Sequence, residues 1–187
     1  MDNFEILNTQ FEGLIEIKNK TFSDIRGTFS EVFRKENFNF LNTSFVQENY
    51  SISMKNVLRG LHFQNSKPQS KFIRCLTGKI FDVAVDLRKN STTYLKHYTK
   101  ILNENESLFL PKGFAHGFIS LEDNTIVYYK TDEYYSPEYD YGIIWNDKTL
   151  KINWNLKELN ITEHALIISE KDKDLPTFEE IKFRINI

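Results

Sequence analysis

Ile80-Phe81-Asp82-Val83-Ala84-Val85-Asp86-Leu87 is the stretch that decides the fold class of this chain. Its side chains alternate with a period of two, which is typical of a β-strand with two different faces. Four bulky apolar side chains share one face, and Asp82, Ala84 and Asp86 share the other. We expect one face to pack on a second sheet and the other to line a cavity that suits a polar ligand. Gly78-Lys79, just before the run, is typical of a hairpin turn from the preceding run.

Short β-type runs separated by turn signals make up most of the remaining chain, and 16 Phe and 9 Tyr favour strands over helices. Within one run, Gln47, Asn49 and Ser51 face the same way, which indicates a second polar-faced strand. Continuous helical patterns are missing between the runs, so the sequence predicts an all-β antiparallel sandwich or barrel. Short helices are expected at Lys35–Leu41 and Thr177–Ile181. The other strand candidates are Gly13–Lys18, Thr28–Phe33, Phe45–Ser53, Val57–Phe63, Tyr98–Leu102, Ser107–Leu110, Phe118–Ser120 and Thr125–Tyr129.

Length and charge limit the function classes. The 187 residues predict one domain over 1–187. The formal net charge is −2, from 24 Lys and Arg against 26 Asp and Glu, so neither nucleic acid nor an anionic membrane is an expected partner. No apolar stretch approaches the roughly 18 residues of a membrane span, and Met1–Glu5 lacks a signal-peptide pattern, which predicts a cytoplasmic protein. The single cysteine, Cys75, lies in an apolar run, where a buried and unreactive thiol is expected.

Two of the four histidines lie in contexts that suit a binding site. His62 is in Leu58-Arg59-Gly60-Leu61-His62-Phe63-Gln64, and His116 is in a loop-like segment with Pro111 and two glycines. Taken singly, each is more often structural than functional. A metal centre is the first alternative, but Gln64 stands two positions after His62, where a paired His would be needed. Two histidines are fewer than the usual three or four ligands, so no metal is expected.

Charged residues supply further candidates. Arg26, Arg59 and Lys71 each lie next to a turn or a strand end, and an arginine fork suits a phosphate. Singly, each is better explained as a solvated surface charge, and glycine-rich phosphate loops are absent. The run Ser169-Glu170-Lys171-Asp172-Lys173-Asp174 is typical of a solvated turn. Asp172 could also fold back and orient a histidine, and the spacing leaves both interpretations open.

Taken together, these segments resemble the sugar-nucleotide 3,5-epimerases typified by dTDP-4-dehydrorhamnose 3,5-epimerase, in order, from about Thr21 to Leu175. A single motif of this kind is weak, whereas the series in register is specific. The matching stretches are 24–27 with Phe29 and Glu31, 47–49 with Ser51 and Ser53, 57–64, 81–88, 111–118, 129–131, 134–137, 144–147 and 169–172.

The resemblance implies a cupin-type jelly-roll β-barrel that forms a homodimer by exchanging N-terminal strands and uses no metal or organic cofactor. It implies that His62 is the general base, that Tyr129 is the general acid and that Asp172 holds His62. Asp140 stands where the family usually has a binding Glu. Such departures leave the nucleotide (dTDP or GDP) and the sugar (hexose or heptose) open. The family's other substrate-contacting positions are occupied here by Arg26, Glu31, Gln47, Asn49, Arg59, Lys71, His116 and Lys171.

The implied chemistry is inversion at C3, C5 or both in a nucleotide-linked 4-keto-6-deoxy sugar. The keto group acidifies the neighbouring C–H bonds because the carbanion becomes an enolate, and a base and an acid on opposite faces then invert the centre. Lys71 is the candidate cation for the enolate oxygen. Two alternatives stay open: a sugar-nucleotide 3,4-ketoisomerase on the same barrel, and a non-catalytic sugar-binding cupin. The presence of His62, Tyr129 and Asp172 together favours the epimerase.

Overall fold

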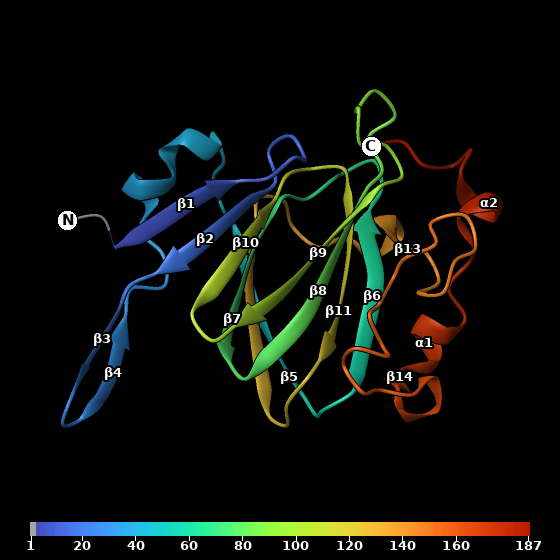
Figure 1. Cartoon of the computed structure of the whole chain (residues 1–187). Helices are drawn as coiled ribbons and strands as arrows, with labels where there is room; N and C mark the ends of the chain where they lie inside the picture. Colours follow the sequence, from blue (N-terminus) through green and yellow to red (C-terminus); the bar gives the residue numbers. More distant parts are fainter. Residues whose placement is uncertain (1–2) are drawn as a thin grey trace.

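Two antiparallel sheets form the body of the protein in the computed structural model, which describes residues 3–187 (Figure 1). In pairing order, the strands of the first sheet are β1 (Phe4–Asn8), β2 (Ile15–Asn19), β10 (Glu106–Leu110), β7 (Lys71–Thr77), β12 (Thr125–Thr131) and β5 (Gln47–Ser53). Those of the second are β13 (Asp140–Gly142), β6 (Val57–Gln64), β11 (Phe114–Ser120), β8 (Lys79–Asp86) and β9 (His97–Asn103). The short strand β14 (Ile167–Ile168) pairs with β6 in parallel.

The helices are all short. They are the 3-10 helices η1 (Lys35–Leu41), η2 (Pro137–Tyr139) and η3 (Glu163–Ala165), and the α-helices α1 (Glu170–Lys173) and α2 (Phe178–Ile181). Both predicted helices are present, and α2 begins after Thr177, whose side chain and Glu180 form a capping box. This β-rich architecture confirms the predicted jelly-roll class. No helix in residues 3–187 has the length and apolar character needed to cross a membrane.

Gly78 was expected to turn a hairpin between β7 and β8, and that prediction is wrong. β7 pairs with β10 and β12, whereas β8 pairs with β11 and β9, so Gly78 joins the two sheets. It takes a φ of +82°, which suits glycine at a change of direction. Local turn residues show that the chain bends there, but they do not show which strand becomes the next partner.

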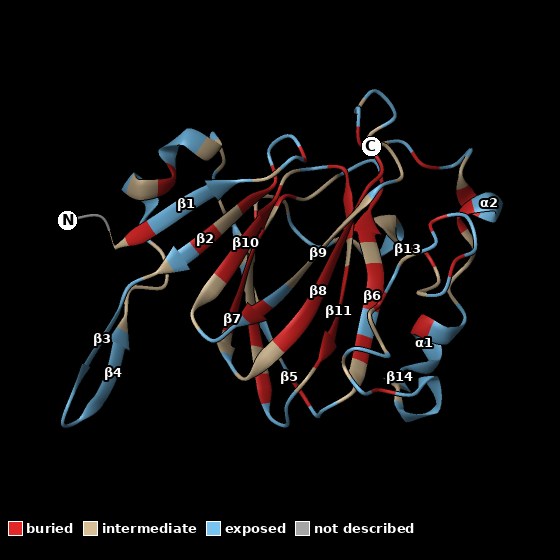
Figure 2. Ribbon diagram, viewed as in Figure 1, coloured by how far each residue is buried: buried red, intermediate tan, exposed pale blue. Residues whose placement is uncertain are grey.

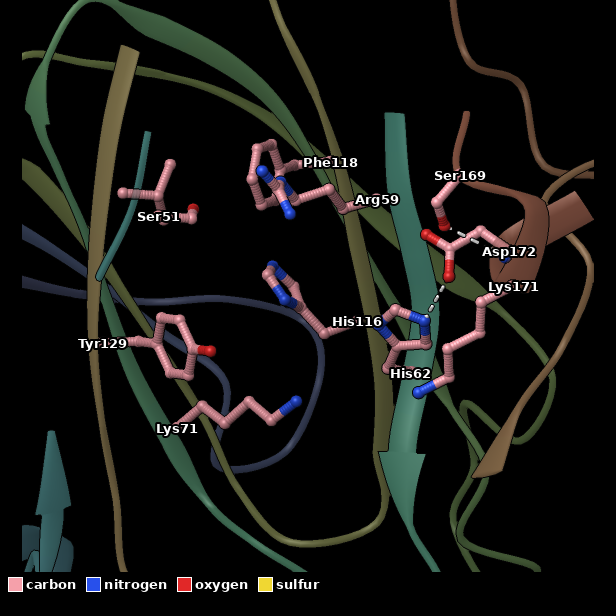
Figure 3. Close-up of a pocket in the computed structure, with 11 residues that line it drawn as sticks. Ser51, Arg59, His62, Lys71, His116, Phe118, Tyr129, Ser169, Lys171 and Asp172 are labelled. Atoms are coloured by element: carbon pink, nitrogen blue, oxygen red, sulfur yellow. Dashed lines mark hydrogen bonds and ion pairs between the residues drawn. The ribbon is translucent and has the colours of Figure 1, made fainter. Parts of the chain in front are cut away.

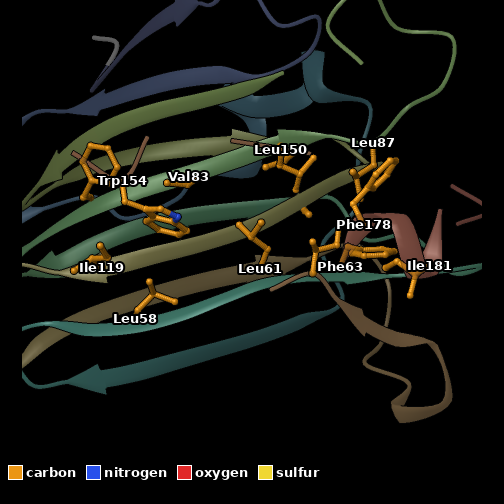
Figure 4. Close-up of a cluster of buried hydrophobic side chains, with 14 of the residues drawn as sticks. Leu58, Leu61, Phe63, Val83, Leu87, Ile119, Leu150, Trp154, Phe178 and Ile181 are labelled. Carbon is orange, nitrogen blue, oxygen red and sulfur yellow. The ribbon is translucent and has the colours of Figure 1, made fainter. Parts of the chain in front are cut away.

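The two faces of β8 also differ from expectation. Ile80 and Ala84 point between the sheets and pack with Ile73, Leu108 and Val127 of the opposite sheet. The bulky apolar face of β8 does not pack on the opposite sheet, as had been expected. It packs instead against the segment after β13, as Figure 4 shows for Val83 and Leu87 beside Leu150, Trp154 and Phe178. The C-terminal segment therefore acts as the outer cover of this sheet (Figure 2).

A third cluster covers part of the outer face of the first sheet, where Phe38 of η1 packs with Ile17 and Phe72. The N-terminal hairpin of β3 (Thr21–Asp24) and β4 (Gly27–Ser30) extends away from the body (Figure 1). Strand β4 ends at Ser30, so the predicted strand Thr28–Phe33 is too long, and β1 and β3 were not predicted. The hairpin exposes Phe22, Ile25 and Phe29 to solvent.

Candidate active site

A cavity of about 300 Å³ opens between the two sheets. Strands β6 and β11 form one wall, β5, β7 and β12 form the other, and α1 closes one side. A second cavity of about 370 Å³ shares His62, Lys71, Tyr129 and Lys171 with the first, so the two form one continuous site. The first is lined by Ser51, Arg59, His62, Lys71, His116, Phe118, Val127, Tyr129, Ser169, Lys171 and Asp172.

His62 and Asp172 form a directly bonded pair in this site. Nε2 of His62 lies 2.8 Å from Oδ1 of Asp172, although the two residues are 110 positions apart in sequence. The other carboxylate oxygen accepts a hydrogen bond from the Gly60 backbone N–H at 3.1 Å. Burial by itself raises the pKa of Asp172, but these hydrogen bonds and the charge of Lys171 outweigh it and the pKa is lowered. Asp172 is therefore ionised, fixed on both oxygens and able to stabilise a protonated His62.

Helix α1 explains why Asp172 points into the site. Ser169 precedes the helix as its N-cap, and its hydroxyl accepts the N–H of Asp172 at 3.1 Å. The charge run 170–174 was expected to be a solvated turn or to supply Asp172. It is a short helix in which Asp172 is the one buried side chain, so the second interpretation describes the structure.

Tyr129 and Lys71 face this pair from the opposite sheet. In Figure 3 the Tyr129 hydroxyl and the Lys71 ammonium point into the space bounded on the far side by His62. Burial lowers the pKa of Lys71 to about 8, partly offset by the charges of Asp140 and Asp82. Burial also raises the pKa of Tyr129, against the effect of Arg59. A phenol that can give a proton and an ammonium that can hold a negative oxygen thus share one wall.

His116 belongs to the same wall as His62, because it lies on β11 directly opposite His62 of β6 in the register. Its Nε2 lies 2.7 Å from Oδ2 of Asp82, which is fully buried on the inner face of β8. Asp82 does not line the cavity itself, so the polar face of β8 reaches the site through His116.

The second cavity holds most of the remaining predicted side chains. Gln47 and Asn49 lie on the inward face of β5 and are joined at 3.2 Å, which confirms that this polar face lines a cavity. Asp140 accepts hydrogen bonds from Lys171 at 2.6 Å and from the Tyr135 hydroxyl at 3.1 Å. The contact with Asp140 raises the pKa of Lys171. These groups offer both donors and acceptors, as recognition of a nucleotide base or a sugar requires.

Arg59 lies at the edge of the first cavity and donates through Nε to the Ser53 hydroxyl at 3.1 Å. Part of its guanidinium remains open, which suits an anionic group of a ligand.

Two predicted site residues, Arg26 and Glu31, lie outside this site. Arg26 lies at the tip of the β3–β4 hairpin with its side chain 85% exposed, paired with Asp24 at 2.6 Å. Glu31 follows the hairpin and pairs with Arg34 at 2.6 Å. Neither residue lines either cavity, because the hairpin extends away from the barrel.

Gln64, which occupies the position considered for a metal-binding His, ties loops together. Its amide donates to the backbone carbonyls of Lys67 and Tyr134 and accepts from the Ser136 N–H. Among residues 3–187 no three His, Cys, Asp or Glu side chains gather as a metal site would require. Cys75 is buried, and burial raises the pKa of its thiol to about 12, as expected of an unreactive cysteine.

Several lining residues were not predicted as site residues. Ser51 was expected only on the polar face of its strand. Phe118, Tyr135 and Ser169 lie in the stretches that carry the resemblance, but no charge or unusual spacing singles them out. Gln69 lies just before β7, in the same loop-to-strand segment as Lys71. Its proximity to Lys71 is the one sequence signal that could have found it.

Comparison with known proteins places this geometry in a family. A sequence profile described as dTDP-4-dehydrorhamnose 3,5-epimerase matches residues 8–180. The chain is 47% identical to the protein of that name from Methanothermobacter thermautotrophicus, over 96% of this chain and 97% of that one. It is 42% identical to the Escherichia coli protein of that name, over 94% and 95%. A crystal structure of dTDP-6-deoxy-D-glucose-3,5-epimerase from Legionella pneumophila in complex with dTDP-4-keto-L-rhamnose is 36% identical, with a TM-score of 0.88 over 97% of this chain and 96% of that one.

Proposed function

We infer the reaction from one premise: this chain belongs to the dTDP-4-dehydrorhamnose 3,5-epimerase family, and it is therefore an isomerase of the epimerase class. We propose that it inverts C3 and C5 of a dTDP-linked 4-keto-6-deoxy hexose. The observation that carries the proposal is the His62–Asp172 pair, which faces Tyr129 and Lys71 across one cavity. The dTDP-linked ligand of the Legionella relative favours dTDP over the GDP alternative.

The proposed mechanism starts with His62, which removes a proton from the carbon next to the keto group. The C–H electron pair moves into the ring and the negative charge collects on the C4 oxygen, beside the ammonium of Lys71. The Tyr129 hydroxyl then donates a proton to the same carbon from the opposite face, which inverts it. The imidazolium of His62 releases its proton to solvent, and solvent returns a proton to the Tyr129 phenolate, so both groups are reset for the second centre. Asp172 stabilises His62 while it carries the proton. Each positioned acid or base contributes roughly 10²–10⁴-fold to the rate.

We further propose a homodimer that exchanges N-terminal strands, as the resemblance implies. Two features support it: the hairpin exposes Phe29, which is 71% accessible, and β5 exposes Tyr50 and Ile52 on the outer face of its sheet. In such a dimer the hairpin would carry Arg26 to the partner's cavity, where its guanidinium would bind the pyrophosphate with Arg59. We also propose that the protein is cytoplasmic, as expected from its sequence.

The reaction is tested by incubating the protein in D₂O with a dTDP-linked 4-keto-6-deoxy hexose and, in parallel, its GDP-linked counterpart. NMR reads the label at C3 and C5 and the configuration of each centre. We expect label and inversion with the dTDP sugar, and the same rate after exhaustive chelation, because no metal is proposed. Movement of the carbonyl to C3 would identify a ketoisomerase instead, and binding without exchange would identify a sugar-binding cupin.

Variants separate the base from the acid. We expect His62→Ala to stop both exchange and inversion, and Asp172→Asn to slow the same step. Tyr129→Phe keeps the ring but removes the proton donor, so exchange should continue on one face while inverted product falls by roughly 10²–10⁴-fold. If Tyr129→Phe inverts at the parent rate, Tyr129 is only a wall of the cavity and another group is the acid.

A further inference from the structure

Asp82 is a buried carboxylate that the mechanism above does not use. It lies on the inner face of β8 and is fully shielded from solvent. One oxygen, Oδ2, lies 2.7 Å from Nε2 of His116, and the other, Oδ1, is buried without a hydrogen-bond partner in the described part of the chain. Most buried polar groups are satisfied, so this incomplete environment needs a physical reason.

The contact fixes one proton of His116. A carboxylate only accepts hydrogen bonds, so Nε2 must carry a hydrogen when it bonds to Asp82. The ring's other nitrogen, Nδ1, has no hydrogen-bond partner within residues 3–187, although the side chain lines the cavity. Nδ1 is therefore the atom of His116 that remains for a ligand.

Among the cationic side chains around Asp82, His116 is the one that contacts it directly, whereas Lys71 acts on it only through its charge. Lys100 lies directly opposite Asp82 on β9, but its ammonium is engaged by Glu16 of β2 at 2.6 Å. The Tyr98 hydroxyl of β9 also bonds to Glu16. Lys71 approaches from the opposite sheet, and His62 lies across from His116 on β6. Because a buried carboxylate needs an adjacent positive charge, the close contact favours a protonated imidazole ring.

We propose that Asp82 is a positioning residue that holds His116 as an imidazolium, with its Nδ1–H directed at the C4 oxygen of the substrate beside Lys71. This proposal rests on the proposed epimerase function. In Figure 3 the His116 ring and the Lys71 ammonium both reach into the space between Tyr129 and His62, where the reacting sugar ring must lie. Two cationic donors would then share the charge that develops on the enolate oxygen. Asp82 acts only through His116, because it does not line the cavity.

The protonation state is tested first without any substrate. The full-length protein, labelled with ¹⁵N-histidine, is measured by NMR at pH 7, and His116→Gln assigns the ring signals. We expect both nitrogens of His116 to have the shifts of an imidazolium in the parent protein. In Asp82→Asn the ring should become neutral. A neutral His116 ring in the parent protein, or identical His116 shifts in the parent and Asp82→Asn, would overturn the proposal, and the first measurement needs no variant to fold.

Kinetics test the consequence for the reaction. Asp82→Asn should slow deuterium exchange at saturating substrate by roughly 10–100-fold, about the effect of weakening one oxyanion donor, while the Kd for dTDP stays within about twofold. Asp147→Asn is the matched control, because Asp147 is equally buried but accepts its hydrogen bonds from backbone N–H groups of the C-terminal segment. It should lower the melting temperature and leave the rate of the folded enzyme unchanged.

The two levels of failure are distinguishable. If the parent protein does not turn over any dTDP-linked 4-keto sugar, the proposed function fails, whereas the NMR result on His116 still stands. If the parent protein is active and Asp82→Asn reacts at the parent rate, the epimerase remains and the role of Asp82 is refuted. If Asp82→Asn and Asp147→Asn lose the same fraction of activity, Asp82 has only a structural role and the proposal is equally refuted.

Discussion

Burial and neighbouring groups together set the protonation states of three ionisable side chains in the cavity. Asp172 stays ionised because the hydrogen bonds from His62 and Gly60 and the charge of Lys171 outweigh its burial and lower its pKa. Tyr129 keeps its proton because burial raises its pKa. Lys71 loses its proton more easily than an exposed lysine, since burial lowers its pKa to about 8. Near neutral pH the site therefore contains a carboxylate, a phenol and an ammonium.

We predict that Lys71 makes the reaction sensitive to alkali. In the proposed mechanism its charged form supports the enolate. Burial lowers the pKa of Lys71 to about 8, so the charged population falls as pH rises through that value, and the turnover number should fall above it by up to tenfold per unit. Lys71→Met should lose roughly 10²–10³-fold at pH 7. Lys71→Arg keeps a charge at every pH tested, so it should be slower than the parent but lack the decline. The rate of deuterium exchange is measured from pH 6 to 10 for the parent protein, Lys71→Met and Lys71→Arg. If Lys71→Arg shows the same decline at high pH as the parent, the decline belongs to the titration of another group.

At the scale of elements, most strands can be predicted from the sequence, but the segments that pack on the outer faces of the sheets cannot. The alternation in Ile80–Leu87 identifies the strand and its two faces, but periodicity does not show what packs on each face. Here the cover is the irregular segment after β13, which has no periodic pattern of its own. The same limit applies to Asp172, because its role depends on a contact 110 positions away. Arg26 shows a different limit, since its side chain is exposed at the hairpin tip and only the proposed dimer would bring it to a site.

Gly60 links strand packing to the site, because β6 and β11 approach too closely there for a side chain. With a φ of +110°, a Cβ at Gly60 would lie 2.6 Å from the His116 carbonyl oxygen. Gly60→Ala should therefore lower the melting temperature by roughly 5–10 °C, from an overpacking cost of about 1–3 kcal/mol plus backbone strain. Gly27→Ala is the control, since Gly27 has a φ of +128° but nothing within 4 Å. If calorimetry gives the same drop in melting temperature for both variants, the positive φ alone accounts for the loss and the close approach of β11 contributes nothing.

At the scale of the whole molecule, one chain holds the acid–base groups and a second chain would complete the anion site. The exposed Phe29 and Tyr50 argue that the hairpin and the outer face of β5 are covered in solution. Sedimentation should therefore give 44.4 kDa, twice the 22.2 kDa of one chain. A mass of 22.2 kDa at micromolar concentration would contradict the dimer.

Mixing two inactive chains tests whether Arg26 acts across the dimer. One chain carries Arg26→Ala and the other His62→Ala, and they are co-expressed. In mixed dimers, the site with an intact His62 would receive Arg26 from its neighbour. Half of randomly formed dimers are mixed, and each mixed dimer has one complete site out of two. At substrate concentrations below KM, the activity should therefore reach about one quarter of that of the parent. No gain over the two separate variants would place Arg26 in its own chain's site or outside any site.

The C-terminal segment that covers β8 and supplies Asp172 sets an order for biosynthesis. The ribosome adds Asp172 110 residues after His62, which takes roughly 6–22 s at about 5–20 residues per second. During that interval the nascent barrel has its histidine, lysine and tyrosine but lacks the carboxylate that contacts His62. It also lacks the apolar cover of its second sheet, so Phe81 and Val83 are open to chaperones. The part of the chain that completes the outer core is thus also the part that, in the proposed mechanism, makes His62 an effective base.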